Sequence, residues 1–189
     1  MPAVSKREQI VSQALELFYQ NGFNATGVDL ICTESGVSKK TLYNHFKSKD
    51  ELVLAVLRKR DELFRNRIMR DTERLGTTAR DRLLSIFDAH DVWFNEAAFS
   101  GCMFVNAAAE FAPHEDPSHK VCAEHKRLLR DYIRDLAELA DARDPEALAA
   151  QLHLLLEGSI VEAHVSGNLE AAKLAKSMAE KIVAKAIDS

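Results

Sequence analysis

Residues 26–49 read TGVDLICTESGVSKKTLYNHFKSK, and this stretch predicts two short helices joined by a tight turn. Thr26 before Gly27 offers a capping arrangement for the first helix, which stops near Gly36. Ser38 is suited to cap the second helix, because a serine hydroxyl accepts a hydrogen bond from a free amide of the first turn. Both helices are therefore predicted from local signals.

The second of these helices has an unusual outer face. Leu42 and Phe46 lie one helical turn apart and predict the side that faces a core. The remaining positions carry cations, hydrogen-bonding groups and one aromatic ring, with no carboxylate: Lys39, Lys40, Thr41, Tyr43, Asn44, His45 and Lys47. A tight turn followed by such a helix is typical of a helix-turn-helix, whose second helix enters the DNA major groove. An ordinary surface helix is the alternative interpretation.

The charge of the chain is unevenly distributed. The formal net charge is −4, which argues against bulk binding of nucleic acid. Residues 1–50 nevertheless carry six basic and five acidic side chains, and residues 35–49 hold four lysines and no acidic residue. A small basic face on an acidic chain is consistent with local DNA contact.

Composition predicts long helices in a reduced, cytoplasmic protein. Of 189 residues 47% are hydrophobic, whereas only seven are glycine and four are proline. No segment reaches the roughly 20 uncharged apolar residues of a membrane span, and residues 1–9 lack an apolar signal core, so we expect a cytoplasmic location and no membrane partner. Three widely spaced cysteines, Cys32, Cys102 and Cys122, predict free thiols rather than disulfides or a metal site.

The rest of the chain predicts helices only. One helix at 5–21 precedes the quoted stretch, and a capping box from Ser48 to Glu51 opens another behind it. Asp144 followed by Pro145 marks a further clear start. Later helices are predicted at about 79–95, 102–111, 118–140, 145–167 and 169–187. We expect an all-α fold, with a three-helix helix-turn-helix domain at residues 1–50 and a larger helical domain at residues 51–189.

The pattern over residues 7–52 resembles the TetR family of bacterial regulators. The resemblance combines core positions, turn glycines and DNA-facing groups in one register, which a helix-turn-helix alone would not do. It rests on Arg7, Ile10, Ala14, Leu17, Phe18, Gly22, Phe23, Thr26, Ile31, Gly36, Val37, Ser38, Thr41, Leu42, Tyr43, His45, Phe46, Lys49 and Leu52. The remaining chain resembles the family only in length and helix count.

This resemblance implies a sequence-specific transcriptional regulator, in most relatives a ligand-responsive repressor that binds a palindromic operator as a homodimer. It implies phosphate contacts from Thr26, Tyr43, His45 and Lys49, with Lys39, Lys40, Thr41 and Asn44 nearest the bases and Ser38 at the start of the recognition helix. Many relatives have glycine at the position of Lys40, so the operator sequence of a relative should not be transferred to this chain.

The resemblance also implies that residues 51–189 hold a small-molecule effector and pair with a second subunit. The candidate pocket residues, for which plain core packing is the alternative, are Phe64, Phe87, His90, Trp93, Phe94, Phe104, Asn106, Glu110, His125 and Tyr132. The candidate dimer contacts are Leu152, Leu155, Ile160, Leu174, Met178 and Ile182. No cofactor is expected.

Three other kinds of site have weaker support. The polar residues His114, Glu115, Asp116, His119 and His125 match no standard zinc motif. Cys102 follows Gly101 at a predicted helix start, where a thiol can be activated, although a buried inert cysteine is the alternative. The helical histidines accompany no recognisable nucleophile, so an enzyme is not predicted. An enzyme on this scaffold stays as one alternative, and a lipid-binding or ligand-binding helical protein without DNA binding is another.

Overall fold

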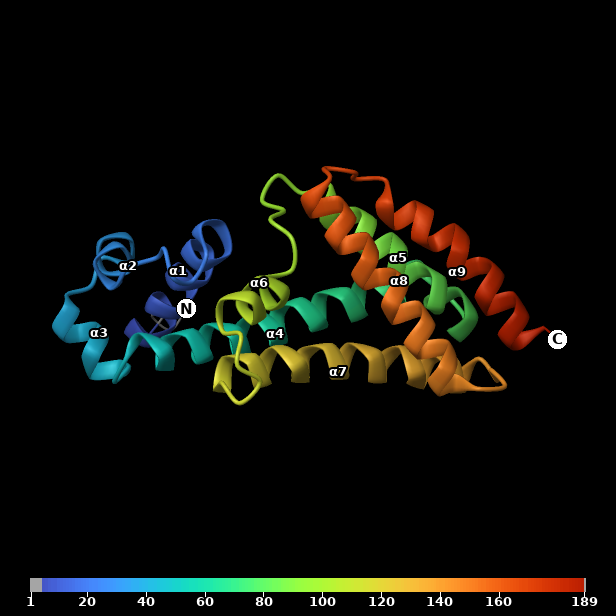
Figure 1. Cartoon of the computed structure of the whole chain (residues 1–189), viewed down its shortest axis with the longest axis horizontal. Coiled ribbons are helices and arrows are strands. Elements are labelled where there is room, and N and C mark those ends of the chain that lie inside the picture. The colour runs from blue at the N-terminus through green and yellow to red at the C-terminus, as the bar shows by residue number, and fades with distance from the viewer. Residues whose placement is uncertain (1–4, 189) are drawn as a thin grey trace. The chain divides into compact units, whose positions relative to one another are not determined.

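The computed structural model describes residues 5–188 and has no strand within them (Figure 1). The helices are α1 (Lys6–Asn21), α2 (Val28–Ser35), α3 (Lys39–His45), α4 (Lys49–Leu75), α5 (Ala79–Phe94), α6 (Met103–Glu110), α7 (Pro117–Leu139), α8 (Pro145–Val165) and α9 (Ala171–Ile187). The all-α prediction is confirmed, and the predicted helices are present with small shifts at their ends. Residues 1–4 and 189, which the predicted domain limits include, lie outside the described part.

Local signals start several helices as predicted. The Ser48 hydroxyl accepts a hydrogen bond from the Glu51 amide at 3.2 Å, at the start of α4. The Glu51 carboxylate reaches one residue further back than in a standard capping box and accepts from the Lys47 amide at 2.7 Å. Asp144 caps α8, and Pro145 occupies its first helical position. These side chains satisfy amides that have no partner within their own helix.

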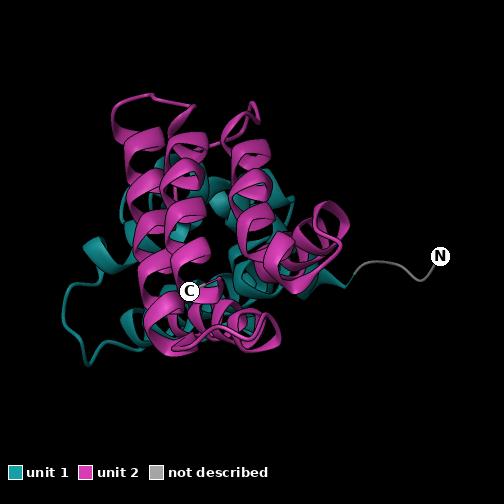
Figure 2. Cartoon of the chain, turned by 90° about the vertical axis from the view of Figure 1, so that its right-hand side faces the viewer, with its two compact units in different colours: residues 1–63, 103–125 teal, residues 64–102, 126–189 magenta. Residues whose placement is uncertain are grey.

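The chain divides into two compact units, drawn in different colours in Figure 2. Unit 1 comprises residues 1–63 and 103–125, and unit 2 comprises residues 64–102 and 126–189. The division falls within α4 and again within α7, so each of these long helices contributes to both units. The predicted boundary after residue 50 concerns the limit of the DNA-binding function, and it stays a prediction.

In unit 1, aromatic side chains join α1 and the loop after it to the end of α6. The Phe18 and Phe23 rings stack with centroids 5.0 Å apart, and Phe23 meets Phe111 edge to face at 5.6 Å. Leu42 of α3 is fully buried. Phe111 follows α6 directly, so residues far along the sequence complete the core beneath the helix-turn-helix.

In unit 2, α5, α8 and α9 lie side by side (Figure 1). The inner face of α9 consists of small side chains, because Ala172, Ala175 and Ala179 are all buried. Small residues allow helix axes to approach closely, and larger apolar residues of α5 and α8, such as Phe87 and Leu156, fill the remaining space. None of the helices among residues 5–188 is both long and apolar enough to cross a bilayer.

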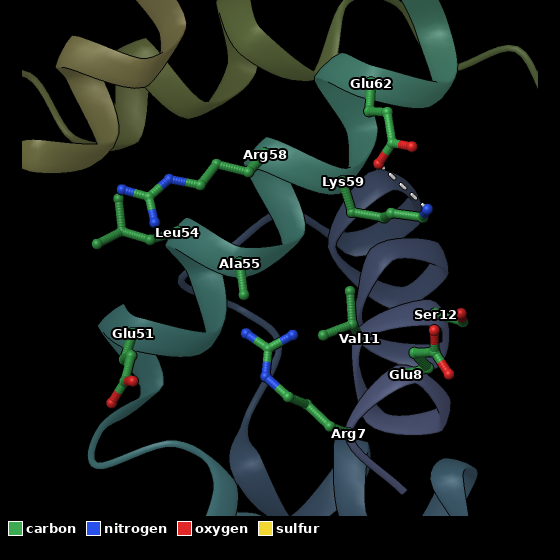
Figure 3. Close-up of a pocket in the computed structure, with 10 residues that line it drawn as sticks. All are labelled: Arg7, Glu8, Val11, Ser12, Glu51, Leu54, Ala55, Arg58, Lys59 and Glu62. Carbon is green, nitrogen blue, oxygen red and sulfur yellow. Dashed lines mark hydrogen bonds and ion pairs between the residues drawn. The ribbon is translucent and has the colours of Figure 1, made fainter. Parts of the chain in front are cut away.

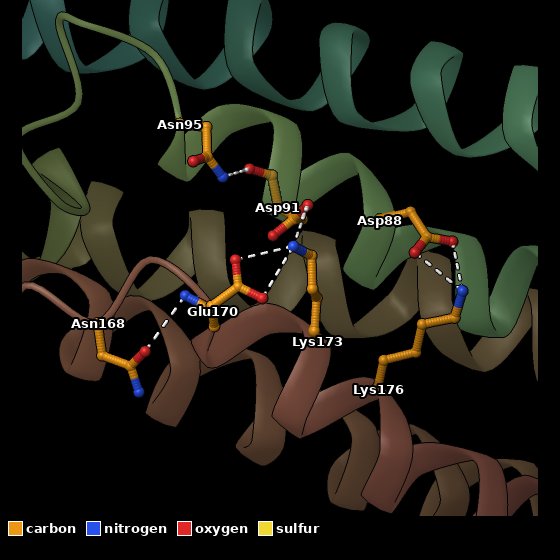
Figure 4. Close-up of polar contacts among 7 residues, drawn as sticks. All are labelled: Asp88, Asp91, Asn95, Asn168, Glu170, Lys173 and Lys176. Carbon is orange, nitrogen blue, oxygen red and sulfur yellow. Dashed lines mark hydrogen bonds and ion pairs between the residues drawn. The ribbon is translucent and has the colours of Figure 1, made fainter.

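Ion pairs add to the junction of α5 and α9 (Figure 4). Lys176 Nζ lies 2.7 Å from an Asp88 oxygen, and Lys173 Nζ lies 3.9 Å from an Asp91 oxygen. Burial raises the pKa of Asp91, an effect that the ammonium of Lys173 opposes. Exposed pairs of this kind contribute about 1 kcal/mol or less, so apolar packing dominates the stability of unit 2.

Candidate nucleic-acid interface

The helix α3 is anchored by one face and exposed on the other. Leu42 and Phe46 are buried, and the Ser38 hydroxyl caps the helix by accepting a hydrogen bond from the Thr41 amide at 3.1 Å. The polar side chains predicted to face outwards are exposed, apart from the half-buried Thr41: Lys39, Lys40, Tyr43, Asn44, His45 and Lys47. The structure therefore presents a continuous polar and basic surface without a carboxylate from α3 itself.

The turn before α3 holds this surface in place. Gly36 has φ of 63° and ψ of 29°, the left-handed conformation that glycine adopts without steric cost. The Val37 amide donates to the Cys32 carbonyl at 3.1 Å, and the Gln9 side chain donates to the Ser35 carbonyl at 2.7 Å. α1 is thereby hydrogen-bonded to the end of α2, which fixes the direction in which α3 leaves the turn.

The cations of the surface are not equivalent. Lys39 Nζ lies 2.6 Å from Asp29 Oδ1, and this hydrogen bond raises the pKa of Lys39. Lys49 is half-buried, with its ammonium 6.0 Å from the centroid of the Phe18 ring. Lys40 is also exposed on α3, but it pairs neither with the Asp29 carboxylate nor with the Phe18 ring. A phosphate or base edge would compete with Asp29 for Lys39, whereas Lys40 is available to DNA without that cost.

Thr26 lies elsewhere than predicted. Its side chain is fully buried, and its hydroxyl donates to the Gly22 carbonyl at 2.7 Å instead of facing solvent. It does not cap α2 either, since the cap residue is Gly27 and makes no side-chain hydrogen bond there. Thr26 therefore stabilises the loop between α1 and α2, and its hydroxyl is unavailable for a phosphate.

The chain matches known proteins over both of its halves. Residues 10–56 match the family described as bacterial regulatory proteins, tetR family, and residues 79–179 match the family described as tetracyclin repressor-like, C-terminal domain. The chain belongs to the TetR family of transcriptional regulators. It is therefore a transcriptional regulator with a DNA-binding helix-turn-helix.

Individual regulators are similar to this chain over part or most of its length. The HTH-type transcriptional regulator YjdC of Escherichia coli is 23% identical over 181 residues, which cover 94% of this chain and 93% of YjdC. The HTH-type transcriptional activator FasR of Mycolicibacterium smegmatis is 40% identical over 90 residues, or 47% of this chain and 40% of FasR. The crystal structure of SCO4454 from Streptomyces coelicolor has a TM-score of 0.87 at 24% identity, covering 96% of this chain and 95% of that one.

One predicted pocket residue of this TetR-family chain has a different role. The Glu110 carboxylate accepts hydrogen bonds from the Phe23 amide at 2.8 Å and from the Asn24 amide at 2.6 Å. It thereby ties the end of α6 to the loop between α1 and α2, all within unit 1. No local pattern could have predicted this contact, because 86 residues or more separate the partners.

Replacing Glu110 with glutamine should lower the free energy of unfolding by about 1–3 kcal/mol, because hydrogen bonds to a charged acceptor are stronger than those to an amide. The glutamine NH₂ group would also face one of the two backbone amides. Urea unfolding followed by circular dichroism measures the change. The matched control is Glu115→Gln, since Glu115 is exposed and forms a surface ion pair with Lys120. Equal stability of the two variants would show that the Glu110 bridge contributes nothing.

The predicted pocket residues fall into two groups. In unit 2, Phe64, His90, Trp93 and Phe94 form one aromatic cluster, in which Phe64 and Trp93 have ring centroids 4.7 Å apart. Phe87 is buried in the same unit and Tyr132 is half-buried there. In unit 1 are Phe104, Asn106, Glu110 and His125. Burial raises the pKa of Tyr132 to about 12, so its phenol stays neutral.

Within unit 1, the His125 ring stacks on Phe104 with centroids 3.7 Å apart. Its Nδ1 lies 2.8 Å from Asp61 Oδ1. His125 also lines a groove of about 470 Å³ with Arg58, Asp61, Pro117, Lys120, Val121 and Glu124. No cluster of His, Cys, Asp and Glu with the geometry of a metal site occurs among the residues that the structure describes.

A second groove of unit 1 lies between α1 and α4 and measures about 450 Å³ (Figure 3). Cations and glutamates of both helices line it, among them Arg7, Arg58 and Glu51, and Lys59 pairs with Glu62 at 3.3 Å. Small-molecule pockets are mostly apolar with a few polar groups. A lining with so many charges of both signs does not resemble the effector pocket predicted from the sequence.

The predicted dimer contacts differ in exposure. Leu152 and Ile160 are buried inside the subunit, so they belong to its own core and not to its surface. Leu155 and Ile182 are half-buried, while Leu174 and Met178 are exposed. The sequence reasoning missed three further exposed apolar residues of α8, namely Leu154, Val161 and Val165. Leu154, Leu174 and Met178 line a shallow groove between α8 and α9 of about 320 Å³.

Proposed function

We propose that this regulator is a cytoplasmic, ligand-responsive repressor that binds a palindromic operator as a homodimer. The carrying observation is the α3 surface, which is anchored by Leu42 and Phe46 and exposes cations and hydrogen-bonding groups without a carboxylate of its own. Two such helices, one from each subunit, would enter successive major grooves of an operator whose symmetry mirrors that of the protein.

The contacts follow from position along the recognition helix. Lys40 and Asn44 lie one turn apart and are exposed, so they are our candidates for base edges, with Lys39 and Thr41 beside them. Tyr43, 48% exposed, and His45 at the helix end are candidates for phosphates, together with Lys49 and the Ser38 end of the helix. Thr26 can contribute only through its backbone.

The dimer is supported by the apolar surface of α8 and α9. Leu154 and Leu174 are 73% and 61% exposed in the subunit, and Met178 is 47% exposed. Exposed apolar residues that gather beside one groove, instead of being scattered singly, are typical of a protein interface. A second copy of this chain supplies a matching surface by two-fold symmetry.

Regulation requires an effector that distinguishes two conformations of the dimer. We assign its binding to the helices after residue 63, with the aromatic cluster of Phe64, His90, Trp93 and Phe94 as the candidate lining. A ligand shifts the equilibrium only by its difference in affinity for the two conformations. Repression is proposed because most relatives are repressors, although the similar FasR is an activator.

The test is selection of bound fragments from random duplex DNA, followed by titration of the enriched sequence at several salt concentrations. A palindrome with a steep salt dependence would support the proposal, because contacts to phosphates release counterions. Enrichment without symmetry would remove the dimeric mode of binding. Weak binding without any enrichment would remove the operator function altogether and favour a helical ligand-binding protein.

A further inference from the structure

A buried thiol meets a half-buried amine and a half-buried carboxylate inside unit 2. Lys126 Nζ of α7 lies 3.3 Å from Cys102 Sγ, and it also donates to both Glu157 oxygens of α8, at 2.7 and 2.6 Å. Cys102 is 6% exposed, and the Lys126 and Glu157 side chains are 22% and 21% exposed. Only small reagents can approach a sulfur in this position.

The backbone at this cluster has little freedom. Gly101 precedes Cys102 with φ of +73°, and a side chain added there would lie 2.6 Å from the ring of His164. The segment that carries Cys102 is therefore held against α8, the same helix that carries Glu157. The sulfur, the amine and the carboxylate are therefore already in contact, and a reaction among them needs no large movement of the backbone.

Contact with an ammonium distinguishes Cys102 from Cys32. The thiolate is the form of cysteine that attacks peroxides, and a donating ammonium stabilises it. Burial and the carboxylate of Asp29 instead raise the pKa of Cys32, which favours its unreactive thiol. We expect Cys102 to be oxidised before Cys32.

We propose that Cys102 and Lys126 form a peroxide-sensitive pair that closes into a covalent sulfur–nitrogen bond. In the first step the thiol reacts with hydrogen peroxide to give a sulfenic acid and one water. In the second step the neutral amine of Lys126 attacks that sulfur, the S–N bond forms, and the hydroxyl of the sulfenic acid leaves as a second water. The sulfur is oxidised and the peroxide reduced, and the chain loses two hydrogen atoms in all.

The cluster can also supply the neutral amine. Burial alone lowers the pKa of Lys126, while the charges of Cys102 and Glu157 raise it above its ordinary value. Formation of the sulfenic acid changes the sulfur that Lys126 contacts, and so weakens one of the interactions that raise the pKa of Lys126. The proton can then pass to Glu157, whose oxygen is 2.6 Å away. Glu157 thus acts as the proton acceptor for capture of the sulfur.

The bond would join the segment before α6 to α7, and a thiol reductant would restore both side chains. The test treats the purified full chain with hydrogen peroxide and measures its intact mass. An internal disulfide and an S–N bond both remove about 2 Da, so the experiment uses the Cys32→Ser, Cys122→Ser double variant, in which Cys102 has no cysteine partner. Tryptic mapping should find one peptide that links Cys102 to Lys126, uncut after Lys126.

Lys126→Arg separates the two steps, because a guanidinium keeps the positive charge but is a poor nucleophile. In this variant, added to the double background, sulfenic acid should accumulate as a gain of about 16 Da that dimedone traps. Lys126→Gln, which removes the charge, should in addition slow the oxidation. Loss of about 2 Da in the arginine variant would overturn the proposal, as would only over-oxidised sulfur in the lysine-containing chain. Neither readout depends on operator binding.

Discussion

Lys40→Glu is expected to lower the affinity of the proposed dimer for its operator roughly a thousandfold at about 0.15 M salt. The side chain is exposed on α3, the proposed recognition helix, and does not share the ion pair that joins its neighbour Lys39 to Asp29. The change from lysine to glutamate alters the charge that faces DNA by two units in each subunit, or about four units in the dimer. Counterion release makes each unit worth about fivefold in affinity at this salt concentration.

The measurement is a titration of labelled operator over a range of salt, by fluorescence anisotropy. The slope of log affinity against log salt should become shallower in the variant. Arg130→Glu is the matched control, because Arg130 is exposed on α7 and its reversal changes the net charge equally. If both variants lose affinity to the same extent, net charge explains the loss and Lys40 has no special place in the interface.

Leu154→Glu is expected to raise the dissociation constant of the dimer more than about a hundredfold. Leu154 is 73% exposed in the subunit, so the change should leave the fold intact. In the dimer the carboxylate would lie in the apolar surface of α8 and α9, and an unpaired charge at a buried position costs about 3–5 kcal/mol. Sedimentation velocity at micromolar concentrations would show the monomer.

Leu139→Glu is the control for this experiment, since Leu139 is 72% exposed but lies at the end of α7. It should remain a dimer. Persistence of the dimer in the Leu154 variant would place the interface on another surface. The monomer should also lose most of its operator affinity, because binding energy from two half-sites would no longer be combined.

The sequence predicts best where neighbouring residues control the structure. Ser38, Gly36 and the Asp144–Pro145 pair act on their own turns, so their helices were predicted with nearly correct ends. The same holds for the exposed face of α3, because Leu42 and Phe46 fix its inner side.

Predictions failed where residues distant in the sequence determine the position of a side chain, or where apolar residues surround a whole helix. Leu152, Leu154, Leu155 and Leu156 follow one another so closely that apolar residues surround α8, and periodicity cannot show which side faces the core. Leu154 proved exposed and Leu152 buried. Thr26 has a side chain that suits solvent or a loop equally, and only the fold brings it to the Gly22 carbonyl.

The contact of Cys102 with Lys126 could not be predicted from the sequence either, because its partners Lys126 and Glu157 come from the distant helices α7 and α8. The helix start beside Cys102 did suggest an activated thiol, but not the amine that would capture it.

The Glu110 bridge bears on how such regulators could be recombined. A chimera that exchanges only residues 1–50 would keep the Phe23 and Asn24 amides but replace the carboxylate that accepts from them. It would also separate Phe23 from Phe111. The transferable module is therefore discontinuous in the gene, and a graft of the DNA-reading part should carry residues 103–125 along with residues up to 63.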